Sequence, residues 1–230
     1  MKKNYTKNLV MLAMFSALAY VCTLVFSIGG IGGFLTFDLK DAVIAIAAMI
    51  YGPLAGLIIS FLVSFVEMFT SVTGWIGFLM NFISTAVFVC SASVCYRYIP
   101  KLKKSLNGAI IALSSSVVLS TAVMLLVNIF ITPIYMKTIG IPMTSADIIA
   151  MIPTVLLPFN LVKCIMNAAI VLVLYKPIST ALKKARVIDG GVEKYKFDKT
   201  SVFLTVVGGL IIIGCAVVFI VLMDGSFSIV

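Results

Sequence analysis

The chain has 230 residues, of which 62% are hydrophobic and 11% charged, and its formal net charge is +9. A water-soluble domain carries about 45–50% apolar and about 25% charged residues, so this composition excludes an ordinary soluble domain and is typical of a membrane protein. The basic residues form no stripe interleaved with aromatics, which argues against a nucleic-acid partner, and the absence of histidine removes zinc-hydrolase motifs and Ser/His or Cys/His catalysis.

Seven hydrophobic segments predict an all-α membrane protein. The long segments have the ~20 residues that cross about 30 Å of hydrocarbon at 1.5 Å per residue. The second is too short to span alone, so it is either tilted within the bundle or extended by the apolar residues before it. The segments cover about residues 8–28, 40–51, 53–70, 75–97, 107–131, 148–176 and 201–223.

The first segment follows three lysines and resembles a signal peptide at its start. Its apolar run continues to Ile28, long enough for a full span, so we interpret it as a retained helix. It carries Ala13, Ser16 and Ala17, and small residues four apart allow close helix approach. The contact they make is either within the fold or with a partner subunit.

The first external loop contains Gly29-Gly30-Ile31-Gly32-Gly33, followed by the apolar stretch 34–37. Glycine imposes little backbone preference, so the pattern fits a lid over a pocket as well as an ordinary flexible loop.

Charge placement predicts the orientation. With a cytoplasmic N-terminus, the inner loops collect 14 basic residues and the outer loops hold only Lys40 and Lys137, while Lys163 lies in the membrane. Positive residues mark the cytoplasmic side, so we predict an external C-terminus. We divide the chain into a six-helix domain (1–186), a cytoplasmic linker (187–200), and an additional transmembrane helix with a short external tail (201–230).

Lys163 is the strongest candidate for a functional residue, because ionisable groups in hydrocarbon are costly. It lies 13 residues before Lys176, which places it roughly 20 Å from the inner end of a regular helix, in the outer half of the membrane. Asn160 shares its helical face, and Pro153 and Pro158 are expected to interrupt the helix there. A ligand site is therefore predicted, with a lysine that snorkels to the headgroups as the alternative.

Other polar residues in the apolar segments are ambiguous. Glu67 either belongs to a site or reaches water at the outer end of the third segment. Asn81 and Asn128 either hydrogen-bond to neighbouring helices or line a site. Trp75 is interpreted as an interface anchor.

The motif Leu157-Pro158-Phe159-Asn160-Leu161-Val162-Lys163 resembles the LPFNxxK signature of the riboflavin-specific S component of energy-coupling-factor transporters. Further pieces agree in order and spacing: Phe34–Asp38 with Asp41, Tyr51–Gly56, Asn81–Ile83, and Asn128 followed by Pro133–Tyr135. The resemblance covers about residues 8–186, so the seventh segment has no counterpart in it. It implies a six-transmembrane-helix S-component-like bundle, here with an extra C-terminal transmembrane helix.

The resemblance also implies a function and a site. The subunit would capture riboflavin outside the cell, and a shared transmembrane coupling subunit and two cytoplasmic ATPases would energise uptake. Helix one would dock on the coupling subunit through Ala13, Ser16 and Ala17. Riboflavin is the transported ligand, and no cofactor or metal is expected. The substrate-binding residues implied are Lys163 and Asn160 on the polar ring edge, Asn128 and Asn81 elsewhere in the pocket, and Leu35, Thr36 and Phe37 as the lid.

The sequence departs from the family pattern in the third segment. Ser60 stands where a glutamate is often found, and Glu67 lies seven residues later on the same face, so we include Glu67 as a substrate-binding candidate. Contacts to the ribityl chain stay open. The alternative function is an S component for another vitamin, or for FMN or FAD.

Overall fold

The fold is described from a computed structural model that covers residues 5–31, 35–71, 73–100, 105–185, 187–188, 199–222 and 228–229. These residues are almost entirely helical, which confirms the predicted all-α character of the body. The elements are α1 (Tyr5–Phe26), β1 (Ile28–Ile31), β2 (Leu35–Phe37), α2 (Lys40–Tyr51), α3 (Pro53–Glu67), α4 (Gly74–Tyr98), α5 (Leu106–Thr138), α6 (Ser145–Met151), the π-helix η1 (Ile152–Leu156), α7 (Leu157–Lys184), α8 (Lys199–Leu222) and β3 (Ser228–Ile229).

Each predicted hydrophobic segment contains a helix. Within the described residues, five helices are long and apolar enough to cross a membrane: Thr6–Phe26, Gly74–Tyr98, Leu106–Thr138, Ser145–Lys184 and Val202–Val221. The helix α3, with 15 residues, and α2, with 12, are shorter. Large apolar side chains are exposed along these helices, and in hydrocarbon such faces need no polar cover.

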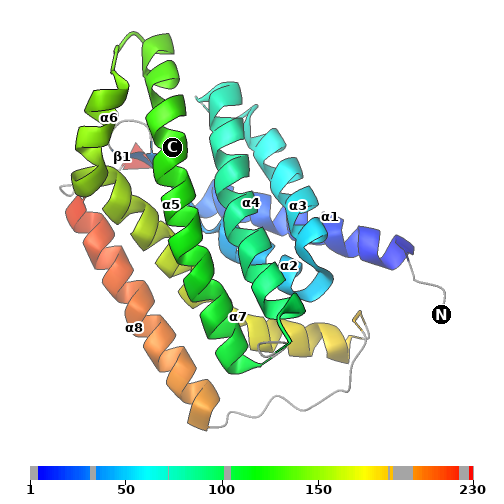
Figure 1. The fold of residues 1–230 in the computed structure, drawn as a ribbon. Helices are drawn as coiled ribbons and strands as arrows, with labels where there is room; N and C mark the ends of the chain where they lie inside the picture. Colours follow the sequence, from blue (N-terminus) through cyan, green and yellow to red (C-terminus); the bar gives the residue numbers. More distant parts are fainter. Residues whose placement is uncertain are drawn as a thin grey trace.

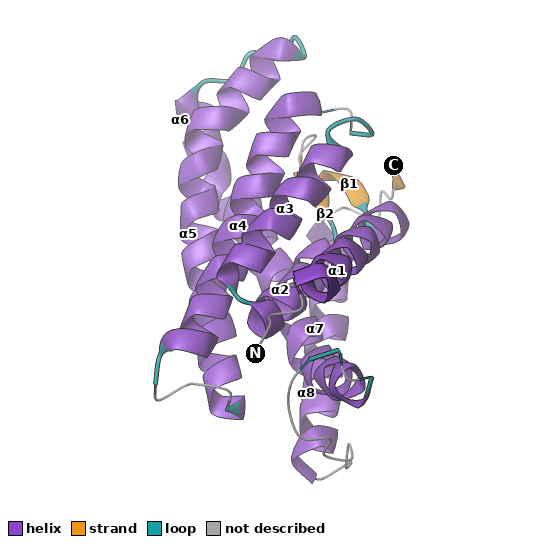
Figure 2. Cartoon of the chain, turned by 90° about the vertical axis from the view of Figure 1, so that its right-hand side faces the viewer, coloured by secondary structure: helices purple, strands orange, loops and turns teal. Residues whose placement is uncertain are grey.

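The short helix α2 forms the centre of the bundle (Figures 1 and 2). It contacts α1, α3, α4 and α7, and nine of its twelve residues are buried. Gly52 joins α2 to α3 with a φ of 115°, a left-handed value that favours glycine, and Pro53 then begins α3. Arg97 of α4 donates hydrogen bonds to the last carbonyls of α2, those of Met49 and Ile50. Of the two alternatives predicted for this segment, a short helix within the bundle is the one found, and its C-terminal end is held by α3 and α4.

The helices α3 and α4 approach α2 closely at Gly56. A Cβ atom at this position would lie 2.4 Å from a Val89 methyl group and 2.6 Å from the Ala48 Cβ. The helices approach so closely at this crossing that only a very small side chain fits, as is common where membrane helices pack through small residues.

The prediction that prolines break the sixth segment is wrong in part. The chain stays helical from Ser145 to Lys184, and the irregularity is one π-helical stretch, Ile152–Leu156, that contains Pro153. Pro158 lies in the first turn of α7, where a missing N–H is tolerated. The wider π turn accommodates the prolines without ending the helix.

A small antiparallel sheet, absent from the all-α prediction, lies at one end of the bundle. Its strand order is β2-β1-β3, so the end of the chain pairs with the first loop after α1. Figures 1 and 2 show the C-terminal strand next to β1. Of the predicted glycine-rich loop, Gly32 and Gly33, with Phe34 after them, lie outside the described residues.

Candidate functional site

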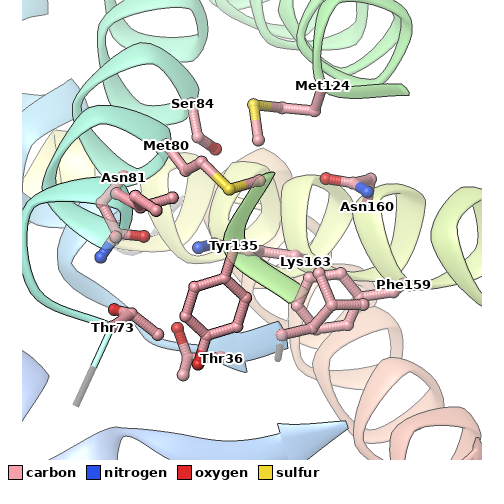
Figure 3. Close-up of a pocket in the computed structure, with 13 residues that line it drawn as sticks. Thr36, Thr73, Met80, Asn81, Ser84, Met124, Tyr135, Phe159, Asn160 and Lys163 are labelled. Carbon is pink, nitrogen blue, oxygen red and sulfur yellow. The ribbon is translucent and has the colours of Figure 1, made fainter. Parts of the chain in front are cut away.

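A pocket opens between the β1–β2 hairpin and the helices α4, α5 and α7 (Figure 3). It collects polar groups among apolar and aromatic ones, as small-molecule sites do. Its lining residues are Leu35, Thr36, Thr73, Ile76, Gly77, Met80, Asn81, Ser84, Met124, Tyr135, Phe159, Asn160 and Lys163.

The cavity itself is small, about 60 Å³. Sites for drug-sized ligands measure about 300–1,000 Å³, so a larger ligand requires lining side chains to move. Met80 and Met124 extend toward each other from α4 and α5 in Figure 3. Methionine is unbranched and flexible, so these two side chains are the ones best suited to give way.

Lys163 is buried and paired with carboxylates. Its Nζ donates to Asp38 Oδ2 at 3.1 Å and lies 3.9 Å from Asp41 Oδ2. The alternative of a lysine that snorkels to the headgroups is thereby wrong, because only 6% of Lys163 is exposed. Its ammonium faces both the pocket and the carboxylates, so the carboxylates hold a charged donor in the pocket wall.

A second buried pair extends this cluster. Lys40, which the charge count placed in an external loop, is 0% exposed, and its Nζ lies 2.5 Å from Glu67 Oε2 and 3.6 Å from Asp38 Oδ2. The Asn81 amide donates to Glu67 Oε2 at 3.4 Å. Glu67 therefore contacts Lys40 and Asn81 rather than open water, and it meets the pocket through Asn81.

Asn167, one turn after Lys163, fixes the start of α2. Its Oδ1 accepts from the Ala42 N–H at 3.0 Å, and its Nδ2 donates to the carbonyls of Asp38 and Lys163. On the other side, Thr85 donates to Asp41 Oδ1 at 2.6 Å. Because these bonds join α2, α4 and α7, the carboxylates beside Lys163 are held by buried hydrogen bonds.

The structure brings five of the eight predicted substrate-binding residues to the pocket lining: Leu35, Thr36, Asn81, Asn160 and Lys163. The other three lie outside the lining. Phe37 is 3% exposed and packs on Phe219, and Asn128 is buried with its amide donating to the Met124 carbonyl and its Oδ1 accepting from Thr132. Glu67 is the third. Ser60, at the divergent position, donates to the Gly56 carbonyl inside α3.

Several lining residues were missed from the sequence, mostly on α4. Thr73, the N-cap residue of α4, recurs with Gly77, Asn81 and Ser84 at helical spacing, which marks one face of α4. A search for polar and small residues on the face of Asn81 would have found them. Tyr135 and Phe159 were quoted as parts of motifs without being assigned to the site.

The matching family model is described as "ECF transporter, substrate-specific component", and it matches residues 7–175. The chain belongs to this family. The family places it among the substrate-specific components of transporters and not among enzymes, which agrees with the exclusion of hydrolytic motifs above. An ECF substrate-specific component is a membrane protein, in keeping with the five helices of membrane-spanning length and composition among the described residues.

The chain matches several known proteins over nearly their whole length. One is described as riboflavin transporter RibU of Staphylococcus aureus (strain TCH60), 27% identical over 77% of this chain and 93% of the relative. Another is riboflavin transporter FmnP of Bacillus subtilis (strain 168), 25% identical over 78% and 96%. A solved structure titled "Structure and mechanism of the S component of a bacterial ECF transporter" matches with a TM-score of 0.63 and 27% identity, over 77% of this chain and 98% of that one.

Three features of this ECF component lie outside the pocket lining. On α1, Ala13 and Ala17 are exposed, while Ser16 is half-buried and donates to the Leu12 carbonyl within the helix. Trp75 is 65% exposed at the start of α4. The helix α8 and the strand β3 lie beyond residue 175, where the family match ends.

Proposed function

We propose that this chain binds riboflavin and serves as the substrate-specific subunit for its uptake. The observation that carries the proposal is the pocket, because Asn160 and Lys163 of the LPFNxxK motif line it together with the hairpin residues Leu35 and Thr36. The curated names of the two relatives above support riboflavin as the ligand.

The lining chemistry suits a flat, largely apolar ring with carbonyls on one edge. Phe159, Tyr135 and the two methionines offer apolar surface, and Lys163 and Asn160 offer donors to the carbonyls. Movement of Met124 would enlarge the cavity and bring in Asn128, one turn further along α5. Asn81 would add an amide at the opposite wall, and Glu67 would act through it.

Charge favours riboflavin over FMN or FAD. Three carboxylates (Asp38, Asp41 and Glu67) face two ammonium groups (Lys40 and Lys163) in the buried cluster. Lys163 is thus already neutralised, so a phosphate dianion would meet no unpaired cation among the described residues of this cluster. We expect the ligand to be neutral at this end.

For the membrane arrangement we propose six transmembrane helices plus α8 as a seventh, in the cell membrane, with the N-terminus cytoplasmic and the C-terminus external. The C-terminal ends of α4 and α7 lie at the opposite end of the bundle from the small sheet (Figure 1), and both helices carry basic residues in their last turns, which fits the positive-inside rule. The pocket beside the sheet then faces the outside. Ala13, Ser16 and Ala17 would dock on a shared transmembrane subunit that two cytoplasmic ATPases drive.

Competition measures the ligand class directly. Purified chain loaded with riboflavin is titrated with FMN, FAD and unrelated vitamins, and the bound flavin is followed by its fluorescence. We expect FMN and FAD to compete at least about tenfold more weakly than riboflavin, in line with one unfavourable charge contact. Stronger competition by FMN, or displacement by another vitamin, would overturn the assignment.

A further inference from the structure

The C-terminal extension, α8 with β3, packs on the part of the molecule that covers the pocket. The buried residues among those described on α8 lie on one stripe: Gly208, Cys215 and Phe219, with the half-buried Ile212, recur at spacings that make one helical face. Apolar side chains away from this stripe include Phe203 and Val221, which are 65% and 69% exposed.

Gly208 sets how closely α8 approaches α7. A Cβ atom at this position would lie 2.5 Å from a Val173 methyl group and 3.7 Å from the Ala169 carbonyl oxygen. The neighbouring Gly209 and the later Gly214 have no atom within 4 Å of such a Cβ. One glycine of the three therefore carries the close helix contact.

Phe219 of α8 packs against both the hairpin and the pocket wall. Its ring centre lies 4.7 Å from that of Phe37, in β2, and 6.3 Å from that of Phe159, in the pocket wall. Phe219 is 4% exposed and belongs to one apolar cluster with Phe37 and with Leu35, a residue of β2 that lines the pocket. Phe37 thus has its partner in α8 and not in the ligand cavity.

The backbone makes a second connection. The strand β3 pairs antiparallel with β1, with Ile229 opposite Ile28 and Ser228 opposite Gly29. The hairpin whose other strand carries Leu35 and Thr36 therefore gains a third strand from the end of the chain. A two-stranded hairpin alone is marginal, and a third strand with an apolar face adds independent stability.

We propose that α8 and β3 form a latch that holds the β1–β2 hairpin over the pocket, with Phe219 as its positioning residue. Because the cavity must enlarge to admit a ligand, a held hairpin slows both entry and exit. The extension beyond the family match thereby sets the exchange rate of the ligand. The identity of that ligand rests on the proposed function, whereas the latch contact itself does not.

Hydrogen exchange tests the latch without any ligand. In the full chain reconstituted in nanodiscs, Phe219→Ala should speed amide exchange in Ile28–Ile31 and Leu35–Phe37 about three- to tenfold, the loss expected from removing aromatic contacts. Phe203→Ala, the same change on the exposed face of α8, should leave it unaltered. Phe219→Leu, which keeps apolar bulk, should restore much of the protection.

A second pair of variants moves the whole helix. Gly208→Val should act like Phe219→Ala on the hairpin, and Gly209→Val should behave as wild type. Exchange at the hairpin within about twofold of wild type in both Phe219→Ala and Gly208→Val would overturn the latch.

Flavin release gives the functional readout. The dissociation rate of riboflavin should rise about three- to tenfold in Phe219→Ala and Gly208→Val, and remain unchanged in the two controls. Unchanged release despite faster hairpin exchange would contradict the control of ligand exchange by the latch. If wild-type chain binds no riboflavin, the proposed function fails, while the exchange data still decide whether the latch exists.

Discussion

Lys163 and Asp38, separated by 125 residues in sequence, form an ion pair of 3.1 Å inside the bundle. The same Asp38 oxygen lies 3.6 Å from Lys40, so one carboxylate joins α7 to the junction of β2 and α2. Since Lys163 also lines the pocket, the pair connects the pocket wall to the segment that follows the covering hairpin. Lys163 therefore both holds the bundle together and lines the pocket.

Breaking this pair should destabilise the chain. Lys163→Met leaves the buried Asp41 without its lysine and Asp38 with only Lys40 at 3.6 Å, and an unpaired buried charge costs about 3–5 kcal/mol. Adding Asp38→Asn should recover about 1–3 kcal/mol, because the two residues act as one unit. Thermal unfolding of the purified variants measures both effects, with the exposed Lys137→Met as control. If Lys163→Met unfolds at the same temperature as wild type, or if the effects of the two substitutions simply add in the double variant, the coupling is contradicted.

Asn160→Ala should weaken flavin binding about tenfold, the worth of a hydrogen bond to a ligand carbonyl. The Asn160 side chain donates one hydrogen bond, to the Leu156 carbonyl at the start of α7. Because that carbonyl lies within the helical backbone, its loss of this donor should change thermal unfolding little. Binding titration with Asn107→Ala, an exposed asparagine on α5, provides the control. Equal affinity in Asn160→Ala and wild type would remove Asn160 from the site.

Gly56→Ala should lower the free energy of unfolding by about 1–3 kcal/mol, the range for overpacking a core. The added methyl group would meet both Val89 and Ala48 closer than van der Waals contact allows. Gly209→Ala, which meets no atom within 4 Å, is the matched control. The prediction is wrong if the two variants unfold at the same temperature.

Bulk on α1 should separate binding from uptake. Ala13→Leu with Ala17→Leu fills the exposed small-residue face of α1 and should leave flavin affinity unchanged. Uptake by cells that express the complete transporter should fall about fivefold or more if this face docks on the coupling subunit. Val21→Leu, at another exposed position of α1, should transport normally. Normal uptake by the double variant would move the docking surface elsewhere.

The sequence predicted the helices well because apolar runs and hydrocarbon thickness set their length directly. It also predicted that Lys163 and Asn160 share a face, since helical spacing is regular, and the structure places both at one pocket. That α2 is too short to span the membrane was predicted for the same reason: twelve residues cannot span about 30 Å.

Long-range pairing was not predictable in the same way. Lys40 was counted as an external charge because it begins a hydrophobic segment, yet it is buried against Glu67 from another helix. Only the fold brings such partners together. The pairing of β3 with β1 was not predicted because it joins segments distant in sequence. The π-helical turn at 152–156 was missed because proline content alone does not specify its local hydrogen bonding.

A riboflavin titration of the purified full chain, with Lys163→Ala beside it, tests the central claim most directly. The account predicts yellow protein that binds riboflavin at micromolar concentration or below, and a loss of affinity of about tenfold or more in the variant. Colourless protein that takes up no flavin at micromolar concentrations, or a Lys163→Ala variant that binds as tightly as wild type while folded, would contradict it.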